Sequence, residues 1–389
     1  MKILHLIYTN GVAGAEKYLL HLLPSLREKG FDCHVIMVCS PDSKQLLENY
    51  QELLKSTGTP VTLIITRRRR FLKAAGGINR YLKQHGIKVV HSHLLYSDVL
   101  AIMVKLIFYR KLVIISTKHG YNEQILKKIE YAVDSDNLKK TSKKGIYFYV
   151  TKFVIKKTNY NYAVSRAASL LYYNLGLIKE IMPFIYHGVT VKQLDKTDEI
   201  NNYRLSRKQL ITVGRLEEIK GHRYLLEAMP MIIKEFNDIK LLIIGEGSEK
   251  NNLQQLANRL NINQYVVFMG FNSDPYSYVN KSDVVIIPSL FEPFGLVYIE
   301  AFALKTPVVA FDTAAGNEII QNNITGLLVK PKDSIALAKK IIFLLANPSV
   351  AIKIAEAARQ RYMDHFSTKR MVDDTAAYYK KIENEVNGN

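Results

Sequence analysis

The sequence predicts an α/β protein built from two doubly wound domains, each with a parallel sheet between helices. Short apolar runs alternate with helix-like segments along nearly the whole chain, which is the pattern of consecutive βα units. A polar and irregular stretch at residues 191–208 interrupts this alternation and is expected to link the two domains. The length of 389 residues suits two domains of ordinary size.

The composition indicates a globular protein with an ample hydrophobic core. Hydrophobic residues make up 48% of the chain, and the mean hydropathy is -0.04. No apolar run approaches the ~18 residues of a membrane span. The start, MKILHLIYTN, is predicted to be a first strand and not a signal peptide. Cys33 and Cys39 fall in one predicted strand region, which argues against a disulfide framework and suits a cytoplasmic protein.

The net charge of +19 is concentrated in the first half of the chain. Residues 1–200 hold 31 Lys and Arg against 15 Asp and Glu, whereas residues 201–389 hold 23 against 20. The electrostatic field of such an uneven positive charge attracts an anionic partner. Nucleic acid and an acidic membrane surface are the two candidates that the charge by itself leaves open.

The first predicted strand, Ile3–Tyr8, leads into a turn that contains glycine and ends near Gly14. Such a turn lets backbone N–H groups approach a phosphate, so Gly14 is a candidate binding residue. Further strands are expected at residues 33–38 and 61–65. The run Arg67–Arg70 follows the second of these, either as a solvated loop or as an anion-binding patch.

Two later strands of the first half end at histidines. One predicted strand runs into His91 and His93, whose side chains share a face and could contribute to a metal site. No cluster of cysteines or carboxylates accompanies them, so no metal site is expected. A second strand, at residues 112–117, is followed by His119 and Gly120. A histidine at the carboxyl end of a strand is directed toward the ligand crevice of an α/β sheet; a capping or packing role is the alternative.

The segment at residues 121–157 is basic and aromatic, and Ile146–Lys157 is predicted to form a helix. Its apolar side would consist of Ile146, Tyr149, Val150, Phe153 and Val154. With its fringe of lysines, such a helix could lie in an anionic membrane interface. It could equally be a core helix with a basic rim, and the sequence leaves both interpretations open.

The second half repeats the alternation of strands and helices. A strand at Leu210–Val213 is followed by Arg215 and Lys220, which suit a phosphate because arginine forks onto two oxygens and lysine supplies a compact charge. The strand Ile239–Ile244 ends at Gly245, in a glycine turn before the next helix. This turn lacks the other residues of a P-loop or of a dinucleotide fingerprint, so Gly245 is a secondary candidate.

The next segment carries the strongest functional signal. The strand Val284–Ile287, a loop, and a helix that begins near Leu296 lead to a further strand, which together form a βαβ unit. The amides of Gly295 and Leu296 would lie where a helix N-terminus offers unpaired N–H groups to a phosphate. Glu292 on the loop and Glu300 on the helix can accept hydrogen bonds from the hydroxyls of one ligand.

The sequence of this segment resembles a motif of the retaining glycosyltransferases of family 4. Their signature, P-S-x-x-E-P-F-G-L-x-x-x-E-A, separates two glutamates by seven residues, as Glu292 and Glu300 are separated. The stretches Gly214–Gly221 and Thr117–Gly120 match the G-R-L…K-G and T-x-H-G motifs of the same family. A departure is Tyr186-His187-Gly188-Val189, which stands where the family has Asn-Gly-Val-Asp.

The resemblance implies the GT-B fold, in which two Rossmann-like domains face a central cleft. Residues 1–190 would form the acceptor-side domain and residues 209–365 the domain that binds the nucleotide-sugar. The final helical segment, residues 366–389, would cross back to the first domain.

The resemblance also implies transfer of a sugar from a nucleotide-sugar, with UDP-sugars favoured, with retention at the anomeric carbon and without a metal or a cofactor. The implied catalytic residues are His119 and Glu292, with Glu292 accepting from a sugar hydroxyl. The implied donor-binding residues are Gly14, Arg215, Lys220, Phe294, Gly295, Leu296 and Glu300, the last accepting from the ribose. His93 and Gly245 are secondary positions.

The implied acceptor is a lipid-linked or surface glycan in polysaccharide or lipopolysaccharide biosynthesis, reached at the anionic inner face of the cell membrane. Within enzymes, a soluble small-molecule acceptor is the alternative. A non-catalytic protein that binds sugar-nucleotides is a second alternative. A nucleic-acid-binding protein would explain the charge, but the sequence has no recognised motif with stacking aromatics, so no nucleic-acid partner is expected.

Overall fold

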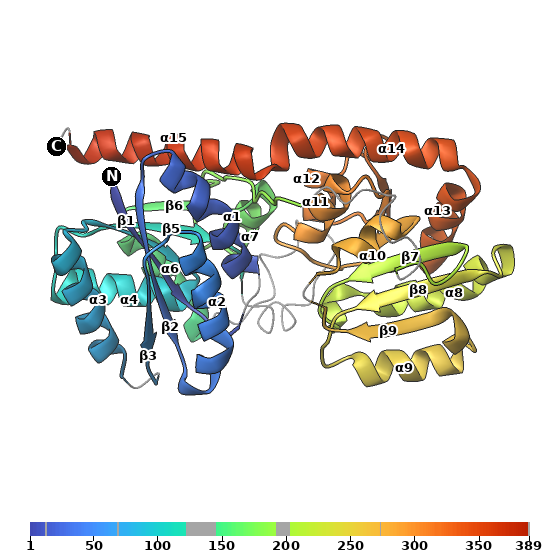
Figure 1. The fold of residues 1–389 in the computed structure, drawn as a ribbon, viewed down its shortest axis with the longest axis horizontal. Coiled ribbons are helices and arrows are strands. Elements are labelled where there is room, and N and C mark those ends of the chain that lie inside the picture. The colour runs from blue at the N-terminus through green and yellow to red at the C-terminus, as the bar shows by residue number, and fades with distance from the viewer. Residues whose placement is uncertain (12–13, 68–69, 122–144, 192–202, 273, 388–389) are drawn as a thin grey trace. The chain divides into compact units, whose positions relative to one another are not determined.

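The computed structural model describes residues 1–11, 14–67, 70–121, 145–191, 203–272 and 274–387. The chain divides into two compact units (Figure 1). Unit 1 comprises Met1–Gly188 together with Thr368–Asn389, and unit 2 comprises Val189–Ser367. Two arginines of the run at 67–70, residues 68 and 69, and most of the expected linker lie outside the described residues.

Unit 1 contains a sheet of six parallel strands in the order β3-β2-β1-β4-β5-β6. The strands are β1 (Lys2–Tyr8), β2 (Asp32–Cys39), β3 (Val61–Ile65), β4 (Val89–His93), β5 (Val113–Lys118) and β6 (Tyr160–Ala163). In the central strands, Ile3 of β1 is level with Cys33 of β2 and with Val89 of β4. The strands β1 and β2 are apolar along most of their length, as expected where helices cover both faces of a parallel sheet.

Helices form a layer on each face of this sheet (Figure 1). One layer consists of α1 (Gly14–Glu28), α2 (Lys44–Ser56) and α15 (Thr368–Asn387). The other consists of α3 (Phe71–His85), α4 (Leu95–Ile107) and α6 (Ile146–Lys157). The helix α7 (Arg166–Asn174) begins after Ser165, whose hydroxyl accepts from the Ala168 N–H at 2.8 Å as an N-cap.

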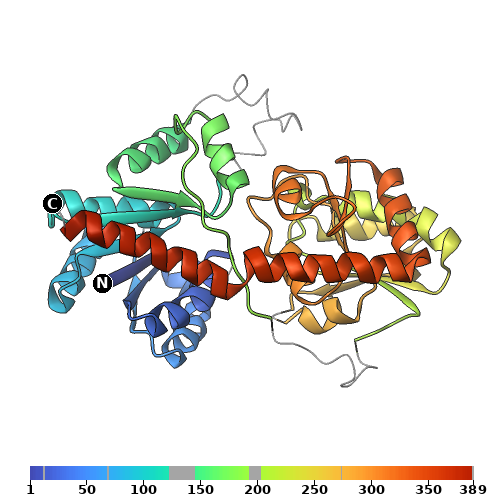
Figure 2. The same cartoon turned by 90° about the horizontal axis from the view of Figure 1, so that it is seen from above.

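The last helix, α15, belongs to unit 1 although the residues before it belong to unit 2. It runs across unit 1 in Figure 2 and packs against α1. Its buried hydrophobic side chains recur with helical spacing and are Met371, Val372, Ala376, Tyr379 and Ile382. The carboxyl-terminal segment therefore completes the core of the unit that the amino-terminal segment begins.

Unit 2 contains a second sheet of six parallel strands, in the order β12-β11-β10-β7-β8-β9. The strands are β7 (Lys208–Val213), β8 (Ile239–Ile244), β9 (Val266–Gly270), β10 (Val284–Ile287), β11 (Val308–Phe311) and β12 (Leu327–Val329). The helices are α8 (His222–Glu235), α9 (Lys250–Arg259), α10 (Tyr276–Lys281), α11 (Leu296–Ala303), α12 (Ala314–Ile319), α13 (Ser334–Ala346) and α14 (Pro348–Arg361). Each sheet thus has the strand order of a doubly wound Rossmann-like domain.

The helix α6 has the predicted bounds, but only part of its predicted apolar side is buried: Val150 and Val154 pack into the core, whereas Ile146, Tyr149 and Phe153 do not. Its buried residues are Phe148, Thr151 and Val154. Tyr149 is 59% exposed and Phe153 is 48% exposed, because only one side of the helix packs against α4. The exposed side of α6 is therefore aromatic.

Within the described ranges, no single helix is both long enough and apolar enough to cross a membrane. One pair of helices, Ser334–Ala346 and Pro348–Phe366, meets the length and composition criteria only when joined across a bend of 101°.

Candidate functional site

The carboxyl edge of the second sheet brings two predicted site loops together. The strand order reverses between β7 and β10, which are neighbours although they are far apart in sequence. In open α/β sheets a crevice forms at such a reversal, outside the carboxyl ends of the strands. Arg215 and Lys220 follow β7, and Glu292 follows β10. The predicted cations and the predicted loop glutamate therefore lie at one edge.

Lys220 and Glu292 contact each other directly. Lys220 ends a 3-10 turn, Glu218–Lys220, and its Nζ donates to Glu292 Oε1 at 2.5 Å. The hydroxyl of Ser289 donates to the same oxygen at 3.1 Å. The two side chains remain 15% and 12% exposed, so a ligand can reach them. This pair is a preformed arrangement of one cation and one hydrogen-bond acceptor.

Gly295 and Leu296 form the start of α11. Gly295 has a φ of 85°, and a Cβ at this position would lie 2.7 Å from the ring of Tyr298. Only glycine fits such a turn without strain. Phe294 is 3% exposed and packs edge-on to Phe366 with ring centroids 5.9 Å apart, so its side chain anchors the loop. The first-turn amides of α11 are consequently presented by a rigidly held loop.

Glu300 lies on α11 and is 6% exposed. Its Oε1 accepts a hydrogen bond from the Tyr276 hydroxyl at 3.2 Å. Burial raises the pKa of the Tyr276 phenol, and the nearby charge of Glu300 raises this pKa further. Tyr276 therefore stays neutral and donates, which orients the Glu300 carboxylate.

Gly245 packs against the backbone of the loop that carries Arg215. It follows β8 with a φ of 146°, and a Cβ there would lie 1.9 Å from the carbonyl oxygen of Gly214. The Gly214 N–H donates to the Ile244 carbonyl at 2.9 Å, so the turns after β7 and β8 are bonded to each other. Gly245 thus allows the close approach of backbones that positions the Arg215 loop.

The strand order of the first sheet reverses between β1 and β4, and here the structure assembles histidines. His93 ends β4, His119 follows β5, and His93 Nδ1 lies 3.1 Å from His119 Nε2. The helix α1, which begins at Gly14, places Tyr18 edge-on to His119 at a centroid distance of 5.2 Å. The predicted residues His93, His119 and Gly14 therefore belong to one edge of unit 1.

The histidines at this edge are neutral at pH 7. Burial lowers the pKa of His119 and of His5 to about 3 each. Burial also lowers the pKa values of His91, His93 and His187 well below the ordinary value. Each imidazole can then both donate and accept one hydrogen bond.

His5, His91 and His93 have ligating atoms within 4.8 Å of one another, which is close enough to share a metal ion. Most of their ring nitrogens already have hydrogen-bond partners. The Tyr379 hydroxyl lies 2.5 Å from His91 Nδ1, and the Thr117 hydroxyl lies 2.6 Å from His91 Nε2. A metal ion would have to displace these partners, so the arrangement fits a hydrogen-bond network better than a metal centre.

A buried ion pair lies on the other face of the same strands. Lys118 Nζ donates to Asp98 Oδ2 at 2.8 Å, and the side chains are 4% and 2% exposed. The hydroxyls of Ser92 and Ser116 donate to Asp98 Oδ1 at 2.5 and 2.6 Å. The residue next to His119 is therefore held in place by a fully satisfied polar network.

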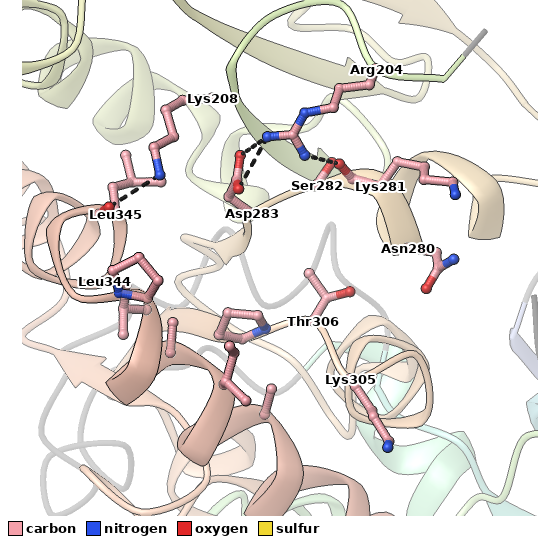
Figure 3. A pocket seen from close by; sticks show the side chains of 15 residues that line it. Arg204, Lys208, Asn280, Lys281, Ser282, Asp283, Lys305, Thr306, Leu344 and Leu345 are labelled. Atoms are coloured by element: carbon pink, nitrogen blue, oxygen red, sulfur yellow. Dashed lines mark hydrogen bonds and ion pairs between the residues drawn. The ribbon is translucent and has the colours of Figure 1, made fainter. Parts of the chain in front are cut away.

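Unit 2 also contains a cavity of about 360 Å³ at the opposite edge of its sheet (Figure 3). Arg204 pairs there with Asp283 at 2.9 Å, as the dashed lines in Figure 3 show. Lys208, the first residue of β7, donates to the Leu345 carbonyl at 3.2 Å. These two basic residues hold neighbouring segments together, and the cavity lies away from the Lys220–Glu292 edge.

Several residues of the two edges carry no strong signal in the sequence. His5 is a polar residue in a buried apolar strand, which is the one clue that local sequence offers. Ser289, Tyr276 and Tyr379 occupy positions that many polar or aromatic side chains could fill. Their roles emerge only from the contacts that the fold creates.

Comparisons with known proteins agree with this architecture. A family model described as "Glycosyltransferase Family 4" matches residues 12–193, and one described as "Glycosyl transferases group 1" matches residues 195–361. An uncharacterised glycosyltransferase of Methanocaldococcus jannaschii is 35% identical over 50% of this chain and 53% of that protein. An uncharacterised protein from the cps region of Klebsiella pneumoniae is 25% identical over 98% of this chain and 99% of that protein.

Among solved structures, HepE from Anabaena in complex with UDP and glucose superimposes with a TM-score of 0.76 at 20% identity. The match covers 98% of this chain and 100% of that one. This similarity shows the fold, which is GT-B. The chain spans about half the length of the first curated relatives that it matches.

Proposed function

Because the chain belongs to the glycosyltransferases of group 1 and family 4, we propose that it transfers a sugar from a nucleotide-sugar to a glycan. The proposed transfer retains the anomeric configuration, and the proposed acceptor is a lipid-linked or surface glycan. The observation that carries the proposal is the Lys220–Glu292 pair at the strand-order reversal of unit 2.

The chemistry requires positive groups at the diphosphate. As the sugar leaves, negative charge grows on the departing phosphate oxygen, and fixed donors aimed at this charge lower the barrier. In the proposal Arg215 and Lys220 bind the diphosphate, together with the amides of Gly295 and Leu296. No metal ion or cofactor takes part.

The two glutamates serve as acceptors in the proposal. Glu300 is buried and oriented by Tyr276, so it suits a fixed hydrogen bond from the ribose. Glu292 is more exposed and suits a hydroxyl of the transferred sugar. Its Oε1 is bonded to Lys220 and Ser289, so one side chain would link the sugar site to the diphosphate site.

A UDP-sugar is the proposed donor, since the structurally similar HepE was solved in complex with UDP and glucose. The test is the thermal stability of the purified protein with UDP, GDP, ADP or CMP. A ligand at a hundred times its dissociation constant adds ~2.7 kcal/mol of stability. We expect UDP alone to raise the melting temperature and expect Arg215→Ala to abolish the shift.

Arg259→Ala is the matched control, because Arg259 is the exposed last residue of α9 and lies at the other end of that helix from the binding edge. It should keep the UDP shift. A shift with GDP in place of UDP would change the donor, and the absence of any shift would contradict the proposed site. Release of UDP from UDP-glucose or another UDP-sugar then separates an enzyme from a non-catalytic binding protein.

The acceptor side of the proposal is an anionic membrane surface, where lipid-linked glycans are found. The charge excess of residues 1–200 supports it. So does α6, on which Ile146, Tyr149 and Phe153 are exposed beside Lys156 and Lys157. An aromatic side flanked by lysines suits the interface of an anionic bilayer, where each basic residue adds ~1 kcal/mol.

Sedimentation with vesicles tests the membrane proposal. We expect the protein to pellet with phosphatidylglycerol vesicles at low salt, but not with phosphatidylcholine vesicles and not at high salt, where charges are screened. The double variant Tyr149→Ser, Phe153→Ser should lose binding. Leu53→Ser is the control, since Leu53 is 52% exposed on α2 in the other helix layer. Equal binding by both variants would reject α6 as the contact.

A further inference from the structure

Unit 1 contains a row of three histidines that runs from its core to the carboxyl edge of its sheet. His5 Nδ1 lies 3.2 Å from His93 Nε2, and His93 Nδ1 lies 3.1 Å from His119 Nε2. His5 and His93 have no exposed surface, whereas His119 is partly exposed. The row therefore has one buried end and one end that a ligand can reach.

The two hydrogen bonds of this row must point in the same direction. Burial keeps the three imidazoles neutral, and a neutral imidazole has one N–H donor and one bare nitrogen acceptor. His93 uses both nitrogens within the row, so it donates to one neighbour and accepts from the other. Either every N–H is directed toward His119, or every N–H is directed toward His5.

The buried end distinguishes these two arrangements. His5 Nε2 has no hydrogen-bond partner among the residues that the structure describes. If the N–H groups were directed toward His5, its Nε2–H would be a buried donor without an acceptor. In the opposite arrangement Nε2 is a bare lone pair, and under-satisfied buried acceptors are more common in proteins than orphaned N–H groups. The row therefore favours N–H groups directed toward His119.

We propose that His5 and His93 are positioning residues that hold His119 as the Nδ1–H tautomer, which presents a hydrogen-bond donor to a ligand oxygen at this edge. His119 Nε2 accepts from His93, so Nδ1–H is the group left for a ligand. Tyr18 holds the His119 ring edge-on, and its hydroxyl shares a hydrogen bond of 2.9 Å with the Tyr162 hydroxyl.

The nature of the ligand rests on the proposed function, because a nucleotide-sugar offers hydroxyl and phosphate oxygens as acceptors. In the Nδ1–H form His119 gives a hydrogen bond to such an oxygen and does not remove a proton from it. The tautomer itself is a property of the free protein, so it can be tested without any substrate.

The first experiment is a long-range ¹H–¹⁵N correlation spectrum of the protein with ¹⁵N-labelled histidine rings, recorded without ligand above pH 7. The His119 signals are assigned by their absence in His119→Gln. We expect a protonated Nδ1 and a bare Nε2. A protonated Nε2 with a bare Nδ1, or an imidazolium, would overturn the proposal. Failure of UDP binding or of transfer would leave this result unchanged, so the two proposals fail separately.

A second experiment should reverse the direction of the hydrogen bonds in the row. His5→Met places a thioether beside His93 Nε2, and a thioether accepts a weak hydrogen bond but cannot donate one. The N–H groups should then turn toward position 5, and His119 should change to the Nε2–H form. His34→Met on β2 is the matched control, since the His34 ring bonds the Tyr81 hydroxyl at 2.8 Å outside the row.

An unchanged His119 tautomer in His5→Met would contradict the proposal. Should His5→Met not fold, the wild-type spectrum remains decisive. Titration with Zn²⁺ gives a further check, because His5, His91 and His93 are close enough to share an ion. We expect one equivalent to leave their ring nitrogens unchanged. Stoichiometric shifts at all three would replace the hydrogen-bonded row by a metal site and would also overturn the proposal.

Discussion

Lys220 Nζ donates a hydrogen bond of 2.5 Å to Glu292 Oε1, although the two residues follow different strands and are 72 positions apart. In the free protein the cation proposed for the diphosphate is therefore paired with the acceptor proposed for the sugar. A bound diphosphate would share the three N–H donors of Lys220 with this carboxylate, whose negative charge opposes a second anion beside it. In the proposed donor site, this pair would couple the sugar half to the diphosphate half.

This coupling predicts that substitutions at Lys220 and Glu292 affect UDP binding differently. Lys220→Ala should weaken UDP binding by about tenfold or more, since a hydrogen bond to a charged group contributes ~1.5–3 kcal/mol. Glu292→Gln removes the competing charge, so it should bind UDP as tightly as the wild type or more tightly. Its transfer rate should nevertheless fall by about 100-fold.

Calorimetric titration with UDP measures the effect on binding, and initial rates with the proposed UDP-sugar donor measure the effect on transfer. Lys234→Ala, at an exposed position in the last turn of α8, is the control for the lysine and should behave as the wild type. If both site variants weakened UDP binding to the same degree, Glu292 would be a direct ligand of the nucleotide and not a competitor for Lys220.

Gly245→Ala should destabilise unit 2 by about 2 kcal/mol or more. The new Cβ would lie 1.9 Å from the Gly214 carbonyl, and the φ of 146° is unfavourable for any other residue. Gly214→Ala on the facing turn is a matched control, because its Cβ would meet nothing within 4 Å. Urea unfolding of both variants checks this, and equal losses would mean that the turns separate easily.

Lys118→Met should reduce the free energy of unfolding by about 3–5 kcal/mol, because it leaves the buried Asp98 carboxylate without its cation. Lys88→Met, at an exposed site just before β4, should change the stability little. Adding Asp98→Asn to Lys118→Met should recover part of the loss, since the unpaired charge is removed as well. A loss below about 1 kcal/mol in Lys118→Met would show that water reaches Asp98.

Acid should destabilise unit 1 at pH values where most proteins remain stable. Burial lowers the folded-state pKa of His5 and His119 to about 3, whereas the ordinary value is about 6.5. Between these values the unfolded chain binds more protons, so stability falls as the pH falls below 6.5. Protonation of each of the two histidines in the unfolded chain should lower the free energy of unfolding by about 2 kcal/mol between pH 6.5 and pH 5.

Calorimetric melting at pH 7 and pH 5 measures this dependence. His5→Leu removes one titrating group and should make the loss of stability smaller. His85→Leu, at an exposed position at the end of α3, is the control and should keep the wild-type dependence. An identical pH dependence in all three proteins would mean that His5 does not become charged on unfolding in this range.

Much of the fold could be predicted from local sequence. The strands Val61–Ile65, Ile239–Ile244 and Val284–Ile287 have the predicted bounds, because a buried parallel strand is an apolar run that ends abruptly at polar or glycine residues. Ser165 caps the amino terminus of α7, and such a cap is a local feature because capping depends on a few neighbouring residues. The order of residues along the chain likewise places Lys220, Glu292 and His119 after strands.

The sequence by itself thus determined the α/β class, most strands and the residues that follow them. Only the tertiary structure decided that Lys220 meets Glu292, that His5 continues the row from His119, and that α15 brings Tyr379 onto His91. It also decided which side of α6 is buried, because α4 and not helical periodicity selects that side. The physical reason is range: periodicity and capping are set within a few residues, whereas these contacts depend on strand order and on helices packed from distant parts of the chain.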